Sequence, residues 1–228
     1  MPGRVWGFRH AIGVPVSLGD AAEVAGTIVV RDRPRVLIAL SMDPALQQRD
    51  DHVDRLRRIV QDEACVVARS RDEAIDQMRR GSQHLVYFYC HGGVDGQGRP
   101  FIRVGAPKDP AIARSTLSTY GIRWASTRPL VFVNGCHTAD VEPERAVEMI
   151  SGFLDTGHAS GVVGTEITVF EPLATEFAEL ALTEFFAGVP LGEAVRRARV
   201  TILGRDLNPL GLVYIPFALA SLALVRDK

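Results

Sequence analysis

Continuous runs of apolar residues recur along the chain, separated by segments in which apolar residues are spaced differently. Four of these runs cover residues 35–41, 64–69, 84–90 and 130–134, and a shorter run of small residues follows at 161–165. An uninterrupted apolar run of this length is typical of a strand buried on both faces of a parallel sheet. We therefore predict a strand at each of these positions.

Between the strands, apolar residues recur every three or four positions, which predicts amphipathic helices. The segments with this spacing are 50–62, 70–81, 146–157, 172–185 and 191–202. The second of these helices begins at a capping box, because Ser70 and Glu73 can each accept a hydrogen bond from the other's main chain. Gly81 marks the end of that helix.

The remaining segments are less regular, above all residues 94–124. Short strands are expected at 5–8, 27–30 and 101–104, a short helix at 115–120, and one or two strands within 213–225. Because strands alternate with helices, the sequence predicts an α/β fold. We expect a three-layer sandwich with a mostly parallel central sheet of about six strands flanked by helices.

Composition narrows the functional classes. The chain has 228 residues, of which 46% are hydrophobic and 23% charged, so it can bury a large core. Its net charge of −1 gives no reason to expect nucleic acid or an anionic membrane as a partner. The longest apolar stretch, residues 210–225, is interrupted by Pro216 and is shorter than the roughly 20 residues of a membrane span.

The cysteines and the first residues indicate a cytoplasmic protein. Cys65, Cys90 and Cys136 make an odd count without the spacing of a disulfide framework, so we expect reduced thiols. The first 15 residues contain glycine, proline and arginine and no continuous apolar segment, which excludes a signal peptide there.

Two residues with catalytic chemistry stand just past the ends of predicted strands. His91 follows LVYFYC, and Cys136 follows PLVFVNG. Parallel strands bring their carboxyl ends to one edge of the sheet, where α/β folds place their sites. A thiolate is a strong nucleophile, and a neighbouring imidazole can take its proton. The histidine comes first and the cysteine 45 residues later, which is close to the separation of about 50 residues in caspases.

Other interpretations of these motifs fit the sequence less well. Cys90-His91 and Cys136-His137 contain metal-binding residue types, but adjacent residues on a strand point to opposite faces and neither pair has the usual zinc spacing. The chain has no G-x-S-x-G elbow and no G-x-x-x-x-G-K-[ST] loop. We therefore expect neither a metal ion nor a cofactor.

The chain resembles the CHAT domain, the caspase-like cysteine peptidase domain of the caspase, separase and gingipain clan that is often joined to TPR repeats. The resemblance lies in YFYCHGG, in LVFVNGCHTAD, in the run from SGVVGTE to GEAVRRAR, and in the closing NPLGLVYIPFALAS. It covers roughly residues 35–225. We therefore expect a caspase-like peptidase domain over 35–228, preceded by an N-terminal extension or edge strands over 1–34.

The resemblance implies a role for each residue of a catalytic dyad. His91 would be the general base and acid, and Cys136 the nucleophile. The main-chain N–H groups of Gly92 and Cys136 would bind the oxyanion. Gly92 and Gly93 also leave room for a substrate carbonyl to approach the main chain.

Candidate substrate-binding residues follow from the same resemblance. Asp95, Asp140, Glu142 and Glu166 are acids that would line a pocket or a loop. Metacaspases that cleave after lysine or arginine carry an aspartate two residues before the nucleophile. Here that position is Asn134, which argues against a basic substrate side chain unless another acid serves.

These residues and the resemblance together predict the function of the chain, with two alternatives. The main hypothesis is a cysteine endopeptidase that cleaves specific protein substrates in regulated bacterial signalling or defence. The alternatives are a catalytically silent caspase-like module that binds proteins, and an α/β domain for a small ligand. No repeat of about 34 residues is present, so a TPR or sensor partner would be a separate protein or domain. Residues 94–124 and 140–144 are the segments expected to become ordered on activation.

Overall fold

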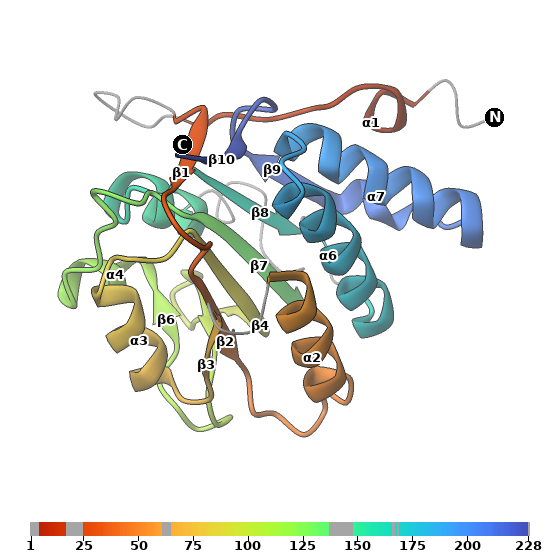
Figure 1. Ribbon diagram of the computed structural model, residues 1–228. Helices are drawn as coiled ribbons and strands as arrows, with labels where there is room; N and C mark the ends of the chain where they lie inside the picture. Colours follow the sequence, from red (N-terminus) through yellow and green to blue (C-terminus); the bar gives the residue numbers. More distant parts are fainter. Residues whose placement is uncertain are drawn as a thin grey trace.

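A computed structural model describes residues 5–16, 25–60, 65–136, 148–165, 167 and 169–227 and has three layers (Figure 1). An eight-stranded sheet forms the middle layer, and six of its strands follow the order β3-β2-β4-β7-β8-β9. Every join along this path is parallel except the one between β8 and β9. The strands are β1 (Thr27–Val30), β2 (Val36–Leu40), β3 (Cys65–Ala68), β4 (Leu85–Val94), β5 (Pro100–Arg103), β6 (Ile112–Ala113), β7 (Leu130–Cys136), β8 (Gly161–Thr165), β9 (Tyr214–Phe217) and β10 (Ala223–Arg226). The predicted three-layer sandwich with a mostly parallel central sheet is confirmed.

Helices cover both faces of the sheet because its strands are apolar on both sides. Figure 1 shows α2, α6 and α7 on one face and α3 and α4 on the other. Ile38 and Leu40 of β2 pack in the core on the face of α2, α6 and α7, whereas Leu37 and Ala39 pack in the core on the face of α3 and α4. The helices are α1 (Trp6–Arg9), α2 (Arg49–Val60), α3 (Arg71–Arg79), α4 (Arg114–Thr119), the π-helix η3 (Gly152–Thr156), α6 (Glu171–Phe186), α7 (Leu191–Asp206) and the 3-10 helix η4 (Pro209–Val213). The capping box predicted at Ser70 and Glu73 is confirmed at the start of α3.

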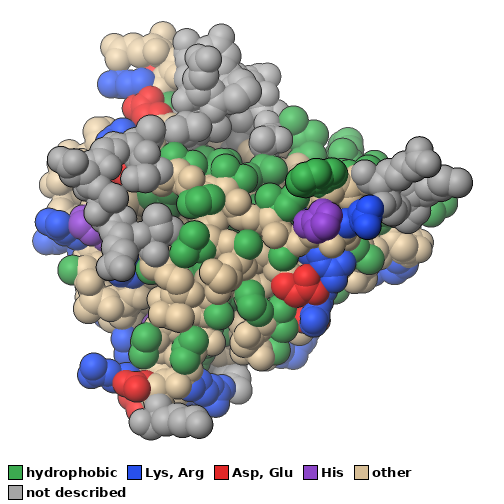
Figure 2. Space-filling model, turned by 90° about the horizontal axis from the view of Figure 1, so that it is seen from above, with side chains coloured by type: hydrophobic (Ala, Val, Ile, Leu, Met, Phe, Trp, Pro, Cys, Tyr) green, Lys and Arg blue, Asp and Glu red, His purple; other side chains and the backbone are tan. Residues whose placement is uncertain are grey.

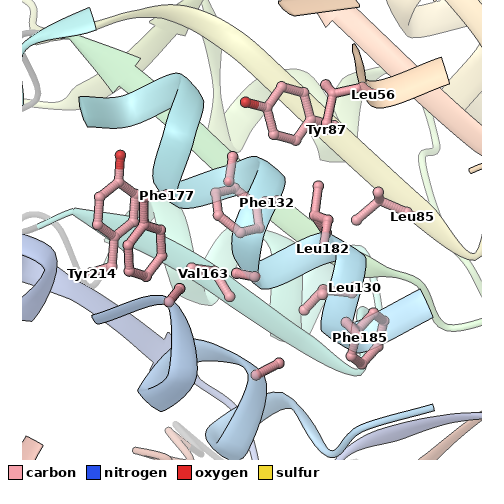
Figure 3. Close-up of a cluster of buried hydrophobic side chains, with 14 of the residues drawn as sticks. Leu56, Leu85, Tyr87, Leu130, Phe132, Val163, Phe177, Leu182, Phe185 and Tyr214 are labelled. Atoms are coloured by element: carbon pink, nitrogen blue, oxygen red, sulfur yellow. The ribbon is translucent and has the colours of Figure 1, made fainter. Parts of the chain in front are cut away.

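Aromatic side chains fill the layer between the sheet and α6. The rings of Phe177 and Tyr214 stack with centroids 3.8 Å apart and planes 7° apart (Figure 3). Tyr87 and Phe132 stand on neighbouring strands of the same cluster, with ring centroids 5.5 Å apart. All four side chains are fully buried. Burial of each ring stabilises the fold by about 2–3 kcal/mol, and aromatic pairing adds to this.

The first segment of the chain differs from its prediction. Residues 5–8 were expected to form a strand, but Trp6–Arg9 form the short helix α1. Its carbonyl groups face cations on α7, because Arg199 donates to the Gly7 carbonyl and Arg196 to the Phe8 carbonyl. These contacts satisfy the carbonyl groups that a helix end leaves unpaired.

β1 forms a separate parallel pair with the last strand, β10. Ile28 and Val30 of β1 are buried in the larger core cluster. The described part of the extension expected over 1–34 therefore contributes to the core.

Seen from above, the described part of the molecule carries mostly hydrophobic and uncharged side chains in the middle of this face and charged ones towards the rim (Figure 2).

Lowering the pH from 7 to 4 is expected to reduce the free energy of unfolding through His84. This side chain is 3% exposed, and its Nδ1 accepts a hydrogen bond from Arg35 N–H at 2.9 Å. Burial, together with the charge of Arg35, lowers the pKa of His84 from 6.5 to about 4. The unfolded chain therefore binds the proton first, and stability is lost as pH falls from about 6.5 towards 4, by up to roughly 3 kcal/mol. Urea unfolding at several pH values measures the slope.

The matched variant is His84→Asn, whose side-chain oxygen can still accept from Arg35 N–H. It should unfold with a shallower pH dependence than the wild type between pH 6.5 and 4. A slope unchanged by this substitution would contradict the assignment. Some slope should remain, because burial also lowers the pKa of His52.

Candidate active site

His91 and Cys136 end two neighbouring strands. β4 and β7 run parallel, and their register pairs His91 directly with Cys136. Neighbouring strands lie about 4.8 Å apart, so the two main chains are adjacent at the carboxyl edge of the sheet. The His91 side chain is 22% exposed. The side chain of Cys136 lies outside the described part of the chain.

A carboxylate that the sequence analysis did not single out lies beside His91. Asp43 follows β2, and its Oδ2 is 3.4 Å from Nε2 of His91. Its other oxygen, Oδ1, accepts from the N–H of Ala45 at 2.9 Å. The available signal was the same one that identified His91, because Asp43 also stands just past the end of a continuous apolar run. An aspartate in this place can hold an imidazole in one orientation.

The loop that carries Asp43 is fixed by main-chain hydrogen bonds. Ser41 N–H donates to the carbonyl of Tyr89, and Met42 N–H donates to the carbonyl of Gly105, both at 2.7 Å. Gly105 has φ +77°, and a Cβ there would meet the main-chain nitrogen of Arg71 at 2.8 Å. Only glycine fits this close contact, so the loop geometry depends on it.

A third strand extends the row of candidate residues. β5 pairs antiparallel with β4 beyond the point where β2 ends, and its register places Arg103 opposite His91. Arg103, His91 and Cys136 therefore stand in one row across β5, β4 and β7. A pocket of about 380 Å³ opens beside His91, and its walls include Asp43, Ala45, Gly92, Phe101 and Arg103.

The ladder between β4 and β5 orients the main chain of Gly92. Asp95 N–H donates to the Arg99 carbonyl, so these two residues form a hydrogen-bonded pair of the antiparallel ladder. Hydrogen-bonded and non-hydrogen-bonded pairs alternate along such a ladder. Gly92 and Ile102, three pairs further along, are therefore a non-hydrogen-bonded pair. The N–H of Gly92 consequently points away from β5 and towards β7, the strand that ends at Cys136.

Asn134 lies in the core and not on a pocket wall. It is 2% exposed. Its amide nitrogen donates to the Tyr87 hydroxyl at 2.6 Å and to the Ala174 carbonyl at 2.9 Å. Its amide oxygen accepts from the Tyr214 hydroxyl at 2.8 Å. These three contacts join β7 to β4, α6 and β9 directly below the candidate pair.

The same chain of hydrogen bonds continues to the surface of α6. His52 is fully buried, with Nε2 2.6 Å from the Tyr87 hydroxyl and Nδ1 2.7 Å from Glu179. Glu179 accepts only, so Nδ1 carries the proton and Tyr87 donates to Nε2. Burial lowers the pKa of His52, and the neutral ring satisfies every partner. Burial opposes ionisation of Glu179, but hydrogen bonds from His52 and Arg55 lower its pKa.

The other substrate-binding candidates are not gathered at the pocket. Asp95 lies in the turn between β4 and β5, where its side chain accepts from the N–H groups of Gln97 and Arg99 and pairs with the Arg99 guanidinium. Asp140, Glu142 and Glu166 lie outside the described residues. The geometry therefore adds Asp43 and Arg103 to the candidates and gives Asn134 a packing role.

The remaining cysteines are separate from the candidate pair. Cys90 is buried and packs on the face of α3 and α4, and Cys65 lies on β3. Within the described ranges, no three His, Cys, Asp or Glu side chains are grouped to hold a metal ion. No helix in these ranges is long and apolar enough to cross a membrane.

A curated protein is similar to nearly the whole of this chain. No family model matches the chain. A probable protease from Vitiosangium sp. is 48% identical over 235 residues, a match that covers 99% of this chain and 31% of that protein. The chain thus spans about a third of the length of the curated relative. The narrower resemblance to a CHAT domain stays a prediction.

Solved structures identify the fold. The separase–securin complex of Saccharomyces cerevisiae aligns over 87% of this chain and 13% of the separase chain, with a TM-score of 0.56 and 14% identity. The Arg-specific cysteine proteinase gingipain R aligns over 87% of this chain and 47% of its own length, with a TM-score of 0.55 and 12% identity. The chain therefore has the caspase-like α/β fold found in separase and gingipain R.

Proposed function

We propose that the chain is the catalytic domain of a cysteine endopeptidase, with Cys136 as nucleophile and His91 as general base and acid. The observation that carries the proposal is the register that places His91 beside Cys136 at the carboxyl edge of the sheet, with Asp43 3.4 Å from the imidazole. The probable protease that matches 99% of the chain supports the reaction class.

The proposed reaction has two stages. His91 takes the proton of the Cys136 thiol, and the thiolate attacks the carbonyl carbon of the scissile bond. His91 then gives this proton to the nitrogen of the leaving amine as the carbon–nitrogen bond breaks, which leaves a thioester. Water, deprotonated by His91, attacks the thioester, and the carboxylic acid leaves as the thiol recovers its proton.

Two further groups assist in this scheme. Asp43 holds the His91 ring so that its other nitrogen faces the thiol. The main-chain N–H groups of Gly92 and Cys136 bind the oxyanion of the tetrahedral intermediate. In the parallel ladder that pairs His91 with Cys136, the Gly92 N–H donates to the Cys136 carbonyl and the Cys136 N–H donates to the Cys90 carbonyl. The end of this ladder therefore opens when an oxyanion binds there.

The proposal extends to the cellular role. The enzyme would act in the cytoplasm on a few specific proteins, in bacterial signalling or defence, under the control of a TPR or sensor protein or domain. The separase chain is likewise solved with a bound protein, securin.

Labelling with a library of peptidyl chloromethyl ketones, followed by intact mass measurement, tests the proposal. The wild type should gain one adduct, and Cys136→Ala should gain none. The matched control is Cys90→Ala, which removes a buried thiol on the other face of the sheet and should still gain the adduct. An adduct that persists in Cys136→Ala would contradict the assignment of the nucleophile. No adduct on any variant would favour a protein-binding module.

A further inference from the structure

Arg103 carries a positive charge into the pocket beside His91, and no described residue provides a carboxylate partner for it. Its Nε is buried and makes no hydrogen bond, and among the described residues no carboxylate lies within ion-pair distance of it. Its guanidinium lies 5.2 Å from the ring centroid of Phe101, a cation–π contact that holds the side chain over the pocket. A partly buried cation without a counter-ion is costly, so the pocket is suited to an anion.

Asp43 is the acid in the same pocket, and each of its two oxygens already has a neighbour. One of its oxygens accepts from Ala45 N–H, and the other faces His91 Nε2. Arg103 is therefore the charged side chain of this pocket that can bind a ligand. An arginine binds a carboxylate with two parallel hydrogen bonds, which gives strength and selects a planar anion.

A second pocket, of about 590 Å³ between α2, α6 and α7, has no buried arginine without a partner in the described part of the chain. Three of its four arginines are paired within the groove, among them Arg197 with Glu184 and Arg205 with Glu176, and the fourth, Arg58, is exposed to solvent. Arg55 is paired with Glu179 in the same way. The pocket beside His91 is thus the better candidate for an anionic group.

The order of residues across the sheet indicates which part of a substrate reaches Arg103. His91 stands between Arg103 and Cys136 in the row across β5, β4 and β7. In peptide cleavage the carbonyl carbon meets the thiol, and the leaving nitrogen meets the imidazole that protonates it. The side chain attached on the nitrogen side therefore lies nearest to the pocket beyond His91.

We propose that this pocket binds the carboxylate of an Asp or Glu residue that directly follows the cleaved bond, with Arg103 as its specificity-determining residue. This substrate class rests on the proposed peptidase function. At about 380 Å³ the pocket has room for a glutamate side chain with water, since one water occupies about 30 Å³.

The test is cleavage of a random peptide library, with the new N-termini identified by mass spectrometry. The wild type should release fragments that begin with Asp or Glu far more often than the library does. Arg103→Gln should abolish this enrichment and lower kcat/KM for a peptide with Glu after the cut by about 10- to 100-fold. The same variant should leave kcat/KM almost unchanged for the matched peptide with Gln there.

Two variants guard against a trivial loss of folding. Arg103→Lys keeps the positive charge and should retain part of the enrichment. Arg99→Gln removes an arginine of the same hairpin, one that pairs with Asp95, and should leave the specificity unchanged. Each variant is used only after its thermal midpoint is shown to match that of the wild type.

Different results contradict the proposed subsite and the proposed peptidase function. Cleavage without acidic enrichment, or with an enrichment that survives Arg103→Gln, overturns the subsite and leaves the peptidase standing. Enrichment of acids before the cut overturns the assignment to the nitrogen side. No cleavage, together with no chloromethyl ketone adduct at Cys136, overturns both proposals.

Discussion

Replacing His91 with alanine is expected to lower kcat/KM for peptide cleavage by about 10³- to 10⁴-fold. The imidazole performs two proton transfers in the proposed cycle, and a positioned general acid–base group contributes about 10² to 10⁴ in rate. His91 is 22% exposed at the edge of the sheet, so its removal leaves no large cavity. A continuous assay on the best library peptide measures the loss, and the thermal midpoint should stay near that of the wild type.

The milder variant Asp43→Asn provides the comparison. It keeps the side-chain volume and an oxygen for Ala45 N–H but removes the charge that faces His91. As a positioning change, it should lower kcat by about tenfold or more with little effect on KM, and it should slow alkylation of Cys136 by iodoacetamide. If His91→Ala retained most of the wild-type rate, His91 would not be the general base.

Asn134→Asp is expected to destabilise the fold by about 3 kcal/mol or more. The amide nitrogen of Asn134 donates to the Tyr87 hydroxyl and the Ala174 carbonyl, and a carboxylate has no donor for either. The new charge would be buried against a carbonyl oxygen without a cation, and such groups are among the most costly in a core. Tyr87 would also turn its proton towards the carboxylate and leave Nε2 of His52 without a donor. The midpoint of urea unfolding measures the loss.

Asn208→Asp is the matched control. The side chain of Asn208 caps η4 by accepting from Leu210 N–H, a contact in which only its oxygen takes part. An aspartate supplies the same oxygen, so this variant should unfold close to the wild type. Equal midpoints for the two variants would show that the donors of Asn134 contribute little, contrary to the hydrogen-bond chain described here.

The order of the elements could be predicted because each has a strong local signal. The apolar runs at 35–41, 84–90 and 130–134 became β2, β4 and β7, since strands buried on both faces carry no polar positions. Residues 5–8 were mispredicted for the opposite reason. Four residues have too little periodicity, and their helical form depends on arginines of α7, nearly 200 positions away in the chain.

The candidate pair could be predicted, whereas its surroundings could not. His91 and Cys136 carry recognisable chemistry at strand ends, and parallel pairing brings such ends together. Arg103 entered the site only because β5 turns back along β4, a register that no local pattern specifies. Asn134 was expected at a substrate pocket from its place two residues before Cys136. The structure instead shows its amide fully occupied by partners from three separate elements.

The pairing of β1 with β10 has a consequence for how the chain folds as it is made. Thr27 lies opposite Ala223, so nearly 200 further residues must be synthesised after β1 before this small sheet can form. Contacts between such distant residues form slowly, because closing a long loop has a large entropic cost. Until then Ile28 and Val30, which are fully buried in the finished fold, lack their partner strand. On the ribosome this early segment would be the part of the domain most exposed to chaperones and to mispairing with other chains.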